Sequence, residues 1–153
     1  MFSVHLQSRL TAWFDGLWYY FRRERQMAER KENHQKGSRG EKAAARFLEQ
    51  QGYAVLERNY TRRVGEIDLI CRQDDTIVFV EVKLRRDIGH GLPIEAVGKT
   101  KQRRIINTAK LYAAEHDLFD YDMRFDVIEV VVDDQNRLWV RHVPGAFMEN
   151  RRI

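Results

Sequence analysis

The sequence has little cysteine and proline, with one Cys and two Pro in 153 residues. The single cysteine, Cys71, excludes an internal disulfide and a multi-cysteine zinc site, and it favours a reducing, cytoplasmic environment. The five histidines are scattered without metal-ligand spacing, and no glycine-rich phosphate loop follows a predicted strand. Repeats and low-complexity segments are absent as well.

Long hydrophobic runs are also missing. The first six residues lack the basic start and uninterrupted apolar run of a secretory signal. The aromatic stretch over residues 13–21 is interrupted by Asp15 and followed by Arg22 and Arg23. It is far shorter than the roughly 18 apolar residues of a transmembrane helix. We therefore expect no signal peptide and no membrane-spanning helix.

The composition is that of a folded, mildly basic domain. Hydrophobic residues make up 43% of the chain, and 27 Lys and Arg against 23 Asp and Glu give a net charge of +4. This length suits one domain with a single core. A net charge of this size permits a nucleic-acid partner without requiring one.

Residues 1–36 differ from the remainder, because they hold seven of the chain's aromatic residues and then become strongly charged. Apolar residues recur at helical spacing, which predicts one amphipathic helix: Leu6, Leu10, Trp13, Leu17 and Tyr20. This helix is expected to pack on the domain over residues 37–153, to bind a second copy or a protein partner, or to lie on a membrane surface. Packing within the chain or in a dimer is the favoured interpretation.

Residues 37–153 predict an α/β domain. Ser38 and Glu41 have the spacing of a capping box at the start of a helix that Gly52 ends. Arg124 and Asp126 share a face of a later strand, where they are expected to pair. The expected order is helix, three strands, helix and two strands, with the strands over residues 53–56, 67–71, 77–83, 125–132 and 138–143 and the second helix over residues 96–116.

The second and third strands form a predicted hairpin with a turn centred between Asp74 and Asp75. This register sets Asp68 opposite Glu81 and Glu66 opposite Lys83, all on one face of the sheet. The other face is wholly apolar and must be buried, which fixes the register: Ile67, Leu69, Cys71, Val78, Val80 and Val82.

Two carboxylates directly opposite each other repel, so a positive charge must offset Asp68 and Glu81. Lys83 is one candidate, and a hard divalent cation such as Mg²⁺ is the other. In the second case the carboxylates hold a metal that activates water against a phosphodiester, while Lys83 assists the nucleophile. The alternative is a solvated strand face with a cluster of salt bridges.

The segments Gly65–Ile70 and Val78–Lys83 resemble the D…ExK core of the PD-(D/E)xK nuclease superfamily. A fuller set of motifs resembles the YraN family of uncharacterised bacterial proteins, which is distantly related to archaeal Holliday junction resolvases: Gly40-Glu41, Arg58-Asn59-Tyr60 and Arg124–Val127. Ile67 stands where the superfamily motif has Pro, which is a frequent variation.

The resemblance implies a restriction-endonuclease-like core with a mixed central sheet flanked by helices, and Mg²⁺ or Mn²⁺ as cofactor. Asp68, Glu81 and the Val82 carbonyl would be metal ligands, with Lys83 as the catalytic lysine. Glu41 would be a further ligand, although the capping box alone also explains it. The implied activity is an endonuclease on DNA or RNA, with branched DNA in repair or recombination as the leading substrate and a homodimer as the assembly.

Basic residues gather after the hairpin, with no acidic residue among them: Lys99, Lys101, Arg103, Arg104 and Lys110. Lys99, Lys101 and Arg104 are candidates for phosphate contacts, and Arg62 and Arg63 could extend the same groove; the alternative is a solvated helix face. By resemblance, Lys101 or Gln102 supports the site. Glu66 is a further supporting candidate, either paired with Lys83 or in the outer part of the site.

Two other functions remain open at this stage. One is a catalytically silent nucleic-acid-binding or scaffold module of the same fold, which the facing carboxylates of Asp68 and Glu81 argue against. The other is an adaptor that binds a partner or a membrane surface through residues 1–36. Deletion of residues 1–36 separates them, since a nuclease survives the deletion and an adaptor loses its binding.

Overall fold

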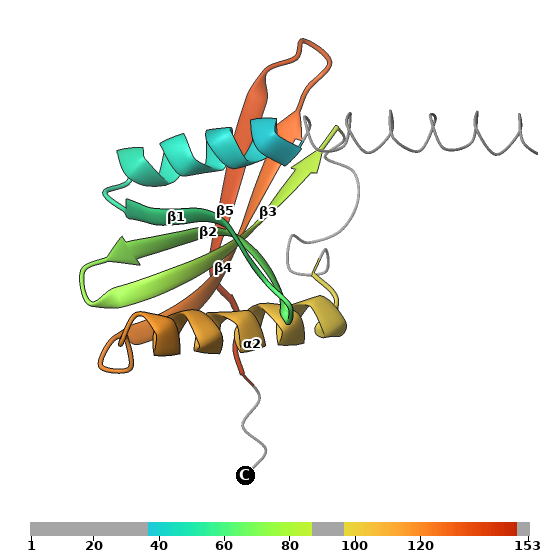
Figure 1. Cartoon of the computed structure of the whole chain (residues 1–153). Helices are drawn as coiled ribbons and strands as arrows, with labels where there is room; N and C mark the ends of the chain where they lie inside the picture. The colour runs from blue at the N-terminus through green and yellow to red at the C-terminus, as the bar shows by residue number, and fades with distance from the viewer. Residues whose placement is uncertain (1–36, 87–96, 150–153) are drawn as a thin grey trace, which may run out of the picture. The chain divides into compact units, whose positions relative to one another are not determined.

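The structure, a computed structural model, describes residues 37–86 and 97–149 (Figure 1). The predicted amphipathic helix over residues 1–36 lies outside them, so the expected division of the chain at residue 36 stays a prediction. In the described part a helix over residues 37–50 comes first. It is followed by β1 (Ala54–Arg62), β2 (Gly65–Gln73), β3 (Thr76–Arg85), α2 (Lys99–Glu115), β4 (Asp122–Val132) and β5 (Leu138–Phe147). The predicted order of elements is confirmed.

The five strands form one mixed sheet in the order β1-β2-β3-β4-β5. Neighbouring strands are antiparallel except β3 and β4, which run parallel. Parallel neighbours need a crossover connection, and α2 lies in the connection between these two strands. The helix over residues 37–50 covers one face of the sheet and α2 covers the other (Figure 1). The structure is therefore α/β with a mixed sheet between two helices, as predicted.

Each face of the sheet has its own hydrophobic cluster. Ala44, Ala45 and Leu48 of the first helix pack with residues that include Leu69 and Val80. On the other face, buried side chains of α2 pack against the sheet, among them Ile105, Ala109 and Tyr112 against Phe79 and Phe125. Because side chains alternate along a strand, a sheet with apolar residues on both faces is buried between two helices.

Both helices approach the sheet closely at glycines. A Cβ atom on Gly40 would lie 3.2 Å from the Cβ of Leu84 in β3. A Cβ atom on Gly65, the first residue of β2, would lie only 2.8 Å from Oγ1 of Thr108 in α2. The absence of a side chain at Gly65 therefore lets β2 begin directly against α2, which brings the basic face of that helix beside the hairpin.

The capping-box prediction is wrong. Residues 37 and 38 are already helical, so Ser38 is not the N-cap residue. The carboxylate of Glu41 instead accepts a hydrogen bond from the side-chain amide of Asn59, at 2.9 Å from Nδ2 to Oε2. The end of the helix is as predicted, since the helical residues stop at 50 and Gly52 has a φ of 86°, in the left-handed region that glycine adopts easily.

The hairpin register is confirmed from Gln73 opposite Thr76 to Leu69 opposite Val80. Beyond Leu69 the regular pairing of β2 with β3 ends, so the predicted pairs Asp68–Glu81 and Glu66–Lys83 do not belong to it. There the carboxylate of Asp68 accepts a hydrogen bond from the backbone N–H of Val82, at 2.7 Å. The side chain of Asp68 therefore replaces a backbone contact between the two strands.

Ile67 does not share the face of Leu69, and its predicted place is wrong. Ile67 packs in the cluster on the α2 side, whereas Leu69 packs under the first helix. The alternation fails where β2 leaves its regular pairing with β3. On the other neighbouring strand, Asn59 lies between the residues paired with Ile67 and Leu69 and has a φ of 54°. The irregularity of both strands therefore lies at the level of Asp68 and Asn59.

Among residues 37–86 and 97–149, no helix is both long and apolar enough to cross a bilayer.

Candidate active site

Glu81 is the most deeply buried carboxylate of the predicted site, with 3% of its surface exposed at the middle of β3. Lys83, two residues along the same strand, donates a hydrogen bond to Oε1 of Glu81 at 2.7 Å. The second oxygen, Oε2, is buried and accepts no hydrogen bond from any residue that the structure describes. A buried carboxylate oxygen without a hydrogen bond is costly, so this atom favours a positive charge beside it.

Asp68 lies beside Glu81 and is partly buried. Burial, followed by the negative charge of Glu81, raises the pKa of Asp68 to about 7, although the Val82 N–H and the charge of Lys101 act in the opposite direction. Two neighbouring carboxylates therefore resist joint ionisation. A divalent cation would relieve this repulsion directly.

Lys101 reaches the two acids from α2. Its Nζ lies 3.5 Å from Oε2 of Glu81 and donates a hydrogen bond to Oε1 of Glu66 at 3.2 Å. Burial alone lowers the pKa of Lys101, but the negative charges around it outweigh that effect and raise the pKa. The predicted pairing of Glu66 with Lys83 is therefore replaced: Glu66, which is exposed, pairs with Lys101, and Lys83 pairs with Glu81.

Glu41 faces the same region from the first helix, since its charge also raises the pKa of Asp68. Its carboxylate is held by the amide of Asn59 at 2.9 Å. Asn59 is the residue of β1 with positive φ, a conformation that Asn tolerates better than most residues. The bend in β1 thus places a hydrogen-bond donor between Glu41 and the sheet.

The described residues provide some, but not all, of the oxygen ligands predicted for a hard divalent cation. Across residues 37–86 and 97–149, no three Asp, Glu, His or Cys side chains lie close enough together to form a ready metal site. The predicted set of Glu41, Asp68 and Glu81 is therefore not assembled as a ready site among these residues, and Glu41 is hydrogen-bonded to Asn59. Asp68 and Glu81 do form a pair of hard oxygen donors, and Oε2 of Glu81 has no hydrogen bond to give up.

A groove of about 460 Å³ lies beside this acidic pair. Most of its charged lining is basic, and Glu66 is the acidic exception: Thr61, Arg62, Arg63, Val64, Gly65, Glu66, Lys101 and Arg104. Arg62 is oriented by a hydrogen bond to Glu115 at 2.8 Å and lies 4.1 Å above the ring of Tyr60. Four cations around one groove form a surface suited to the phosphate groups of a nucleic acid. We call this surface the basic groove.

The remaining residues predicted for the site have different surroundings in the structure. Lys99 is exposed at the first position of α2 and does not line the basic groove. Gln102 donates its side-chain amide to the carbonyl of Val97 at 2.7 Å. Of the two supporting candidates on α2, Lys101 is the one that contacts Glu81. The role of the Val82 carbonyl as a ligand stays a prediction.

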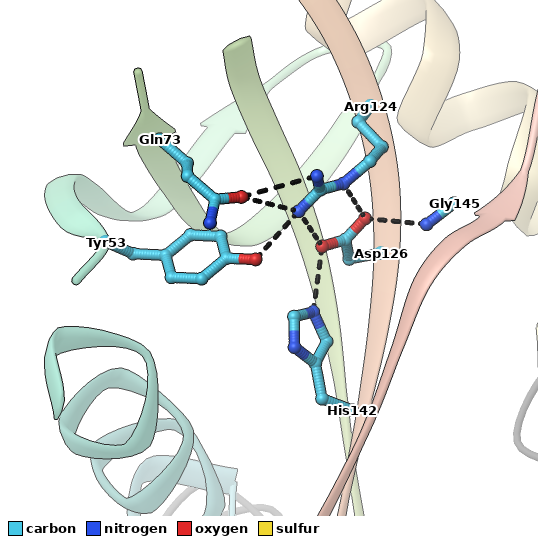
Figure 2. Close-up of polar contacts among 6 residues, drawn as sticks. All are labelled: Tyr53, Gln73, Arg124, Asp126, His142 and Gly145. Atoms are coloured by element: carbon cyan, nitrogen blue, oxygen red, sulfur yellow. Dashed lines mark hydrogen bonds and ion pairs between the residues drawn. The ribbon is translucent and has the colours of Figure 1, made fainter. Parts of the chain in front are cut away.

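A second polar cluster is centred on Asp126 of β4 (Figure 2). Asp126 is fully buried and accepts hydrogen bonds from Arg124 at 2.8 Å and from the backbone N–H of Gly145 at 2.9 Å, while Nε2 of His142 lies 2.8 Å from its carboxylate. Arg124 also donates to the hydroxyl of Tyr53 at 2.9 Å. The predicted Arg124–Asp126 pair is confirmed. Arg124 and Asp126 pair within β4, and their other contacts reach Tyr53, Gln73, His142 and Gly145, so the cluster ties β4 to other parts of the fold.

Sequence reasoning missed Asn59 and His142 as parts of these clusters. Asn59 occurs in a motif of the resembled family, and an Asn inside a strand, a residue type that tolerates positive φ, is the signal that could have directed attention to a bend in β1. His142 is brought to Asp126 by the register of β5 against β4, in which His142 lies opposite Ile128. No spacing in the sequence predicts that contact.

Comparison with known proteins identifies the family. The model of a family described as "Uncharacterised protein family UPF0102" matches residues 40–130. A UPF0102 protein of Myxococcus xanthus is 47% identical over 120 residues, which cover 78% of this chain and 92% of the relative. A UPF0102 protein of Clostridium acetobutylicum is 47% identical over 116 residues, which cover 75% of this chain and 95% of the relative.

The matched region includes Glu41, Asp68, Glu81 and Lys83 as well as the basic groove. A third relative, from Caldanaerobacter subterraneus subsp. tengcongensis, is 44% identical over 113 residues, which cover 72% of this chain and 93% of the relative. The resemblance to a YraN-like uncharacterised family is thereby confirmed. The chain belongs to the uncharacterised protein family UPF0102.

Proposed function

We propose that this protein is a metal-dependent endonuclease that hydrolyses phosphodiester bonds of nucleic acids. The observation that carries the proposal is the buried oxygen Oε2 of Glu81, which accepts no hydrogen bond from the described residues and lies beside Asp68. A strand face that served only as a solvated surface would expose its carboxylates to water. Here one carboxylate is buried without a full set of donors, next to a groove lined by cations.

The fold supports the proposal through the placement of the motif. Asp68 lies on β2 and Glu81 and Lys83 lie on β3, within a mixed sheet covered by one helix on each face. This is the arrangement implied by the resemblance to the PD-(D/E)xK superfamily. We therefore interpret residues 37–149 as a nuclease-like core, with the fold as supporting evidence and the site as the main argument.

Asp68 and Glu81 would hold the Mg²⁺ or Mn²⁺ ion. When bound, such an ion supplies Lewis-acid activation of water and neutralises charge on the phosphate. Lys83 donates a hydrogen bond to Oε1 of Glu81 at 2.7 Å, which orients that carboxylate, and its ammonium would stabilise negative charge that develops on the phosphate. The partly buried position of Asp68 lowers the exposure of the site to water and strengthens each of these charge interactions.

The basic groove would bind the nucleic-acid backbone beside the acidic pair. Arg62, Arg63 and Arg104 line it with Lys101, and the fork of an arginine suits phosphate oxygens. Branched DNA is the substrate class that the resemblance to Holliday junction resolvases favours, and a homodimer would allow two matched cuts at a junction. We also propose that the protein acts in the cytoplasm, in line with its single cysteine.

The test is a cleavage assay with the full chain on labelled duplex, single-stranded, flap and four-way-junction DNA, and on RNA of matched sequence. Each substrate is incubated with Mg²⁺, Mn²⁺ or a chelator. Lys83→Ala removes the proposed catalytic lysine, and Arg137→Ala, an exposed arginine of the β4–β5 turn, serves as the control. The proposal expects metal-dependent cutting that Lys83→Ala abolishes and Arg137→Ala leaves unchanged.

A nucleic-acid-binding module without catalysis is the second candidate, because the basic groove alone would support it. It predicts salt-sensitive binding with no cleavage under any metal condition. A module that only binds phosphate groups does not require the facing carboxylates of Asp68 and Glu81. Cleavage by the wild-type chain would exclude it.

A further inference from the structure

Lys101 contacts the acidic pair and the basic groove at the same time. Its ammonium lies 3.5 Å from Oε2 of Glu81 and 3.2 Å from Oε1 of Glu66. The same side chain lines the basic groove with Arg62, Arg63 and Arg104. No other residue described in the structure both lines this groove and pairs with Glu81. Lys101 is therefore the physical link between the two halves of the site.

The two lysines around Glu81 are held differently. Lys83 donates a hydrogen bond to Oε1 at 2.7 Å, whereas Lys101 approaches Oε2 to 3.5 Å without forming a hydrogen bond. The Lys101 contact is thus the looser of the two ion pairs. Its other partner, Glu66, is an exposed carboxylate that water can solvate when the lysine leaves.

Lys101 lies close to the place that a divalent cation held by Asp68 and Glu81 would occupy. A divalent ion held by Glu81 and Asp68 would repel an ammonium only 3.5 Å from one of its ligand oxygens. The lysine side chain has a flexible four-carbon stem, and 30% of the Lys101 side chain is exposed, so the ammonium has a path away from Glu81. The basic groove that it already lines is the nearest place where phosphate groups would receive it.

We propose that Lys101 is an exchangeable counter-ion: it neutralises Glu81 in the metal-free protein and is released to substrate phosphate in the basic groove when a divalent cation binds. This inference rests on the proposed function, because it takes Asp68 and Glu81 as the metal ligands. It adds a coupling between metal binding and nucleic-acid binding, because the metal releases one more positive charge into the basic groove. Metal binding would thereby strengthen the hold on nucleic acid, and nucleic acid would strengthen the hold on metal.

The first test measures Mn²⁺ binding to the full chain by electron paramagnetic resonance, without nucleic acid and at fixed pH and salt. Lys101→Met keeps most of the stem and removes the charge, and Lys101→Arg keeps the charge. Lys110→Met is the matched control, because Lys110 lies on the same helix and pairs with Glu149. We expect Lys101→Met to bind Mn²⁺ about three- to tenfold more tightly than wild type. Lys101→Arg and Lys110→Met should bind as wild type does.

The second test detects the release itself. Lysines of the wild-type protein are labelled briefly with an amine-reactive acetylating reagent, with and without saturating Mn²⁺, and the labelling of each lysine is read by mass spectrometry. Release predicts faster labelling of Lys101 in the presence of Mn²⁺, with labelling of Lys110 unchanged. Added duplex DNA should then protect Lys101 again.

The outcomes separate this inference from the proposed function. If wild type binds Mn²⁺ and cuts DNA but Lys101 labelling does not change, the exchange is refuted and the nuclease remains. If Lys101→Met binds Mn²⁺ no more tightly than wild type, Lys101 does not compete with the metal, and the inference is again refuted. If wild type binds no Mn²⁺ at all, the inference and the metal-dependent function fail together.

Discussion

The carboxylate of Asp68 accepts the backbone N–H of Val82 at 2.7 Å, across the two strands that carry the candidate site. This contact replaces regular strand pairing immediately beyond Leu69 and Val80. It holds Asp68 beside Glu81, where two negative charges are unfavourable without a cation. The sheet therefore maintains a strained electrostatic arrangement at one place, which is typical of a functional site.

The stability of the metal-free protein should depend on the ionisation of Asp68. The pKa of Asp68 is raised to about 7 in the folded state, mainly by burial, from an ordinary value of about 4. The folded state therefore binds the proton more tightly than the unfolded state, so this group lowers the free energy of unfolding as pH rises from about 4 to about 7. Asp68→Asn keeps an acceptor for the Val82 N–H and has no carboxylate to ionise. This variant should therefore keep its free energy of unfolding as pH rises through this range.

Urea unfolding in a chelator at pH 5, 6, 7 and 8 checks this expectation. Asp68→Asn should be more stable than wild type at pH 8, by about 4 kcal/mol for the full shift, and the difference should shrink toward pH 5. An equal difference at every pH would show that Asp68 does not titrate in this range.

Asn59 should contribute separately to the cleavage rate, through Glu41, and to the stability of the bent backbone of β1. Asn59→Gly removes the hydrogen bond to Glu41 but accepts a φ of 54°, whereas Asn59→Ala removes the bond and strains the backbone. Both variants should lose a similar part of the cleavage rate, and Asn59→Ala should be less stable than Asn59→Gly by about 1 kcal/mol. Thermal unfolding and single-turnover cleavage measure the two effects. Full activity in both variants would remove Asn59 from the site.

The basic groove should determine how nucleic-acid binding depends on salt. Arg63→Ala and Arg104→Ala each remove one cation from its lining. Each should weaken binding to duplex DNA and reduce the slope of log affinity against log salt by about 0.9. Fluorescence anisotropy at several salt concentrations gives both quantities, and Arg137→Ala should change neither. Slopes identical to wild type in both groove variants would place the nucleic acid elsewhere.

The Arg124–Asp126–His142 cluster should stabilise the fold without acting on substrate. Burial alone raises the pKa of Asp126, but hydrogen bonds from His142, Arg124 and Gly145 outweigh it and lower the pKa. The resulting stability is present above about pH 4 and is lost as pH falls through the folded-state pKa. Asp126→Asn should lower the free energy of unfolding at pH 7 by about 2–4 kcal/mol.

The control for this prediction is Arg58→Ala, which breaks an exposed ion pair with Glu49 and should change stability by less than about 1 kcal/mol. Nuclease activity per folded molecule should stay the same in Asp126→Asn at low temperature. A loss of activity without a loss of stability would assign Asp126 to the catalytic machinery.

Local patterns in the sequence were sufficient to predict the hairpin. The polar turn at Asp74 and Asp75 and the apolar residues on both sides of it allow one register, and the structure has that register from Leu69 to Val80. The Arg124–Asp126 pair was predictable for the same reason, because residues two apart on a strand share a face.

Long-range contacts determine what could not be predicted. Ile67 changes face because the Asp68 side chain bonds the backbone of Val82, and alternation carries no information about such a contact. The choice of Lys101 over Gln102 depends on how α2 is rotated against the sheet, which the close contact of Gly65 with Thr108 sets. Asn59 and Glu41 are 18 residues apart in sequence, and their contact joins β1 to the first helix.

The most direct test of the account is the single-turnover cleavage rate of wild type and Glu81→Gln on the preferred DNA substrate with saturating Mn²⁺. Glu81→Gln has nearly the shape of the native residue but lacks the charge of a metal ligand. The account predicts metal-dependent cleavage by wild type and a loss of at least about 100-fold in the variant, with folding retained. Cleavage at the wild-type rate by Glu81→Gln would contradict the role of the acidic pair, and no cleavage by wild type on any substrate would contradict the nuclease itself.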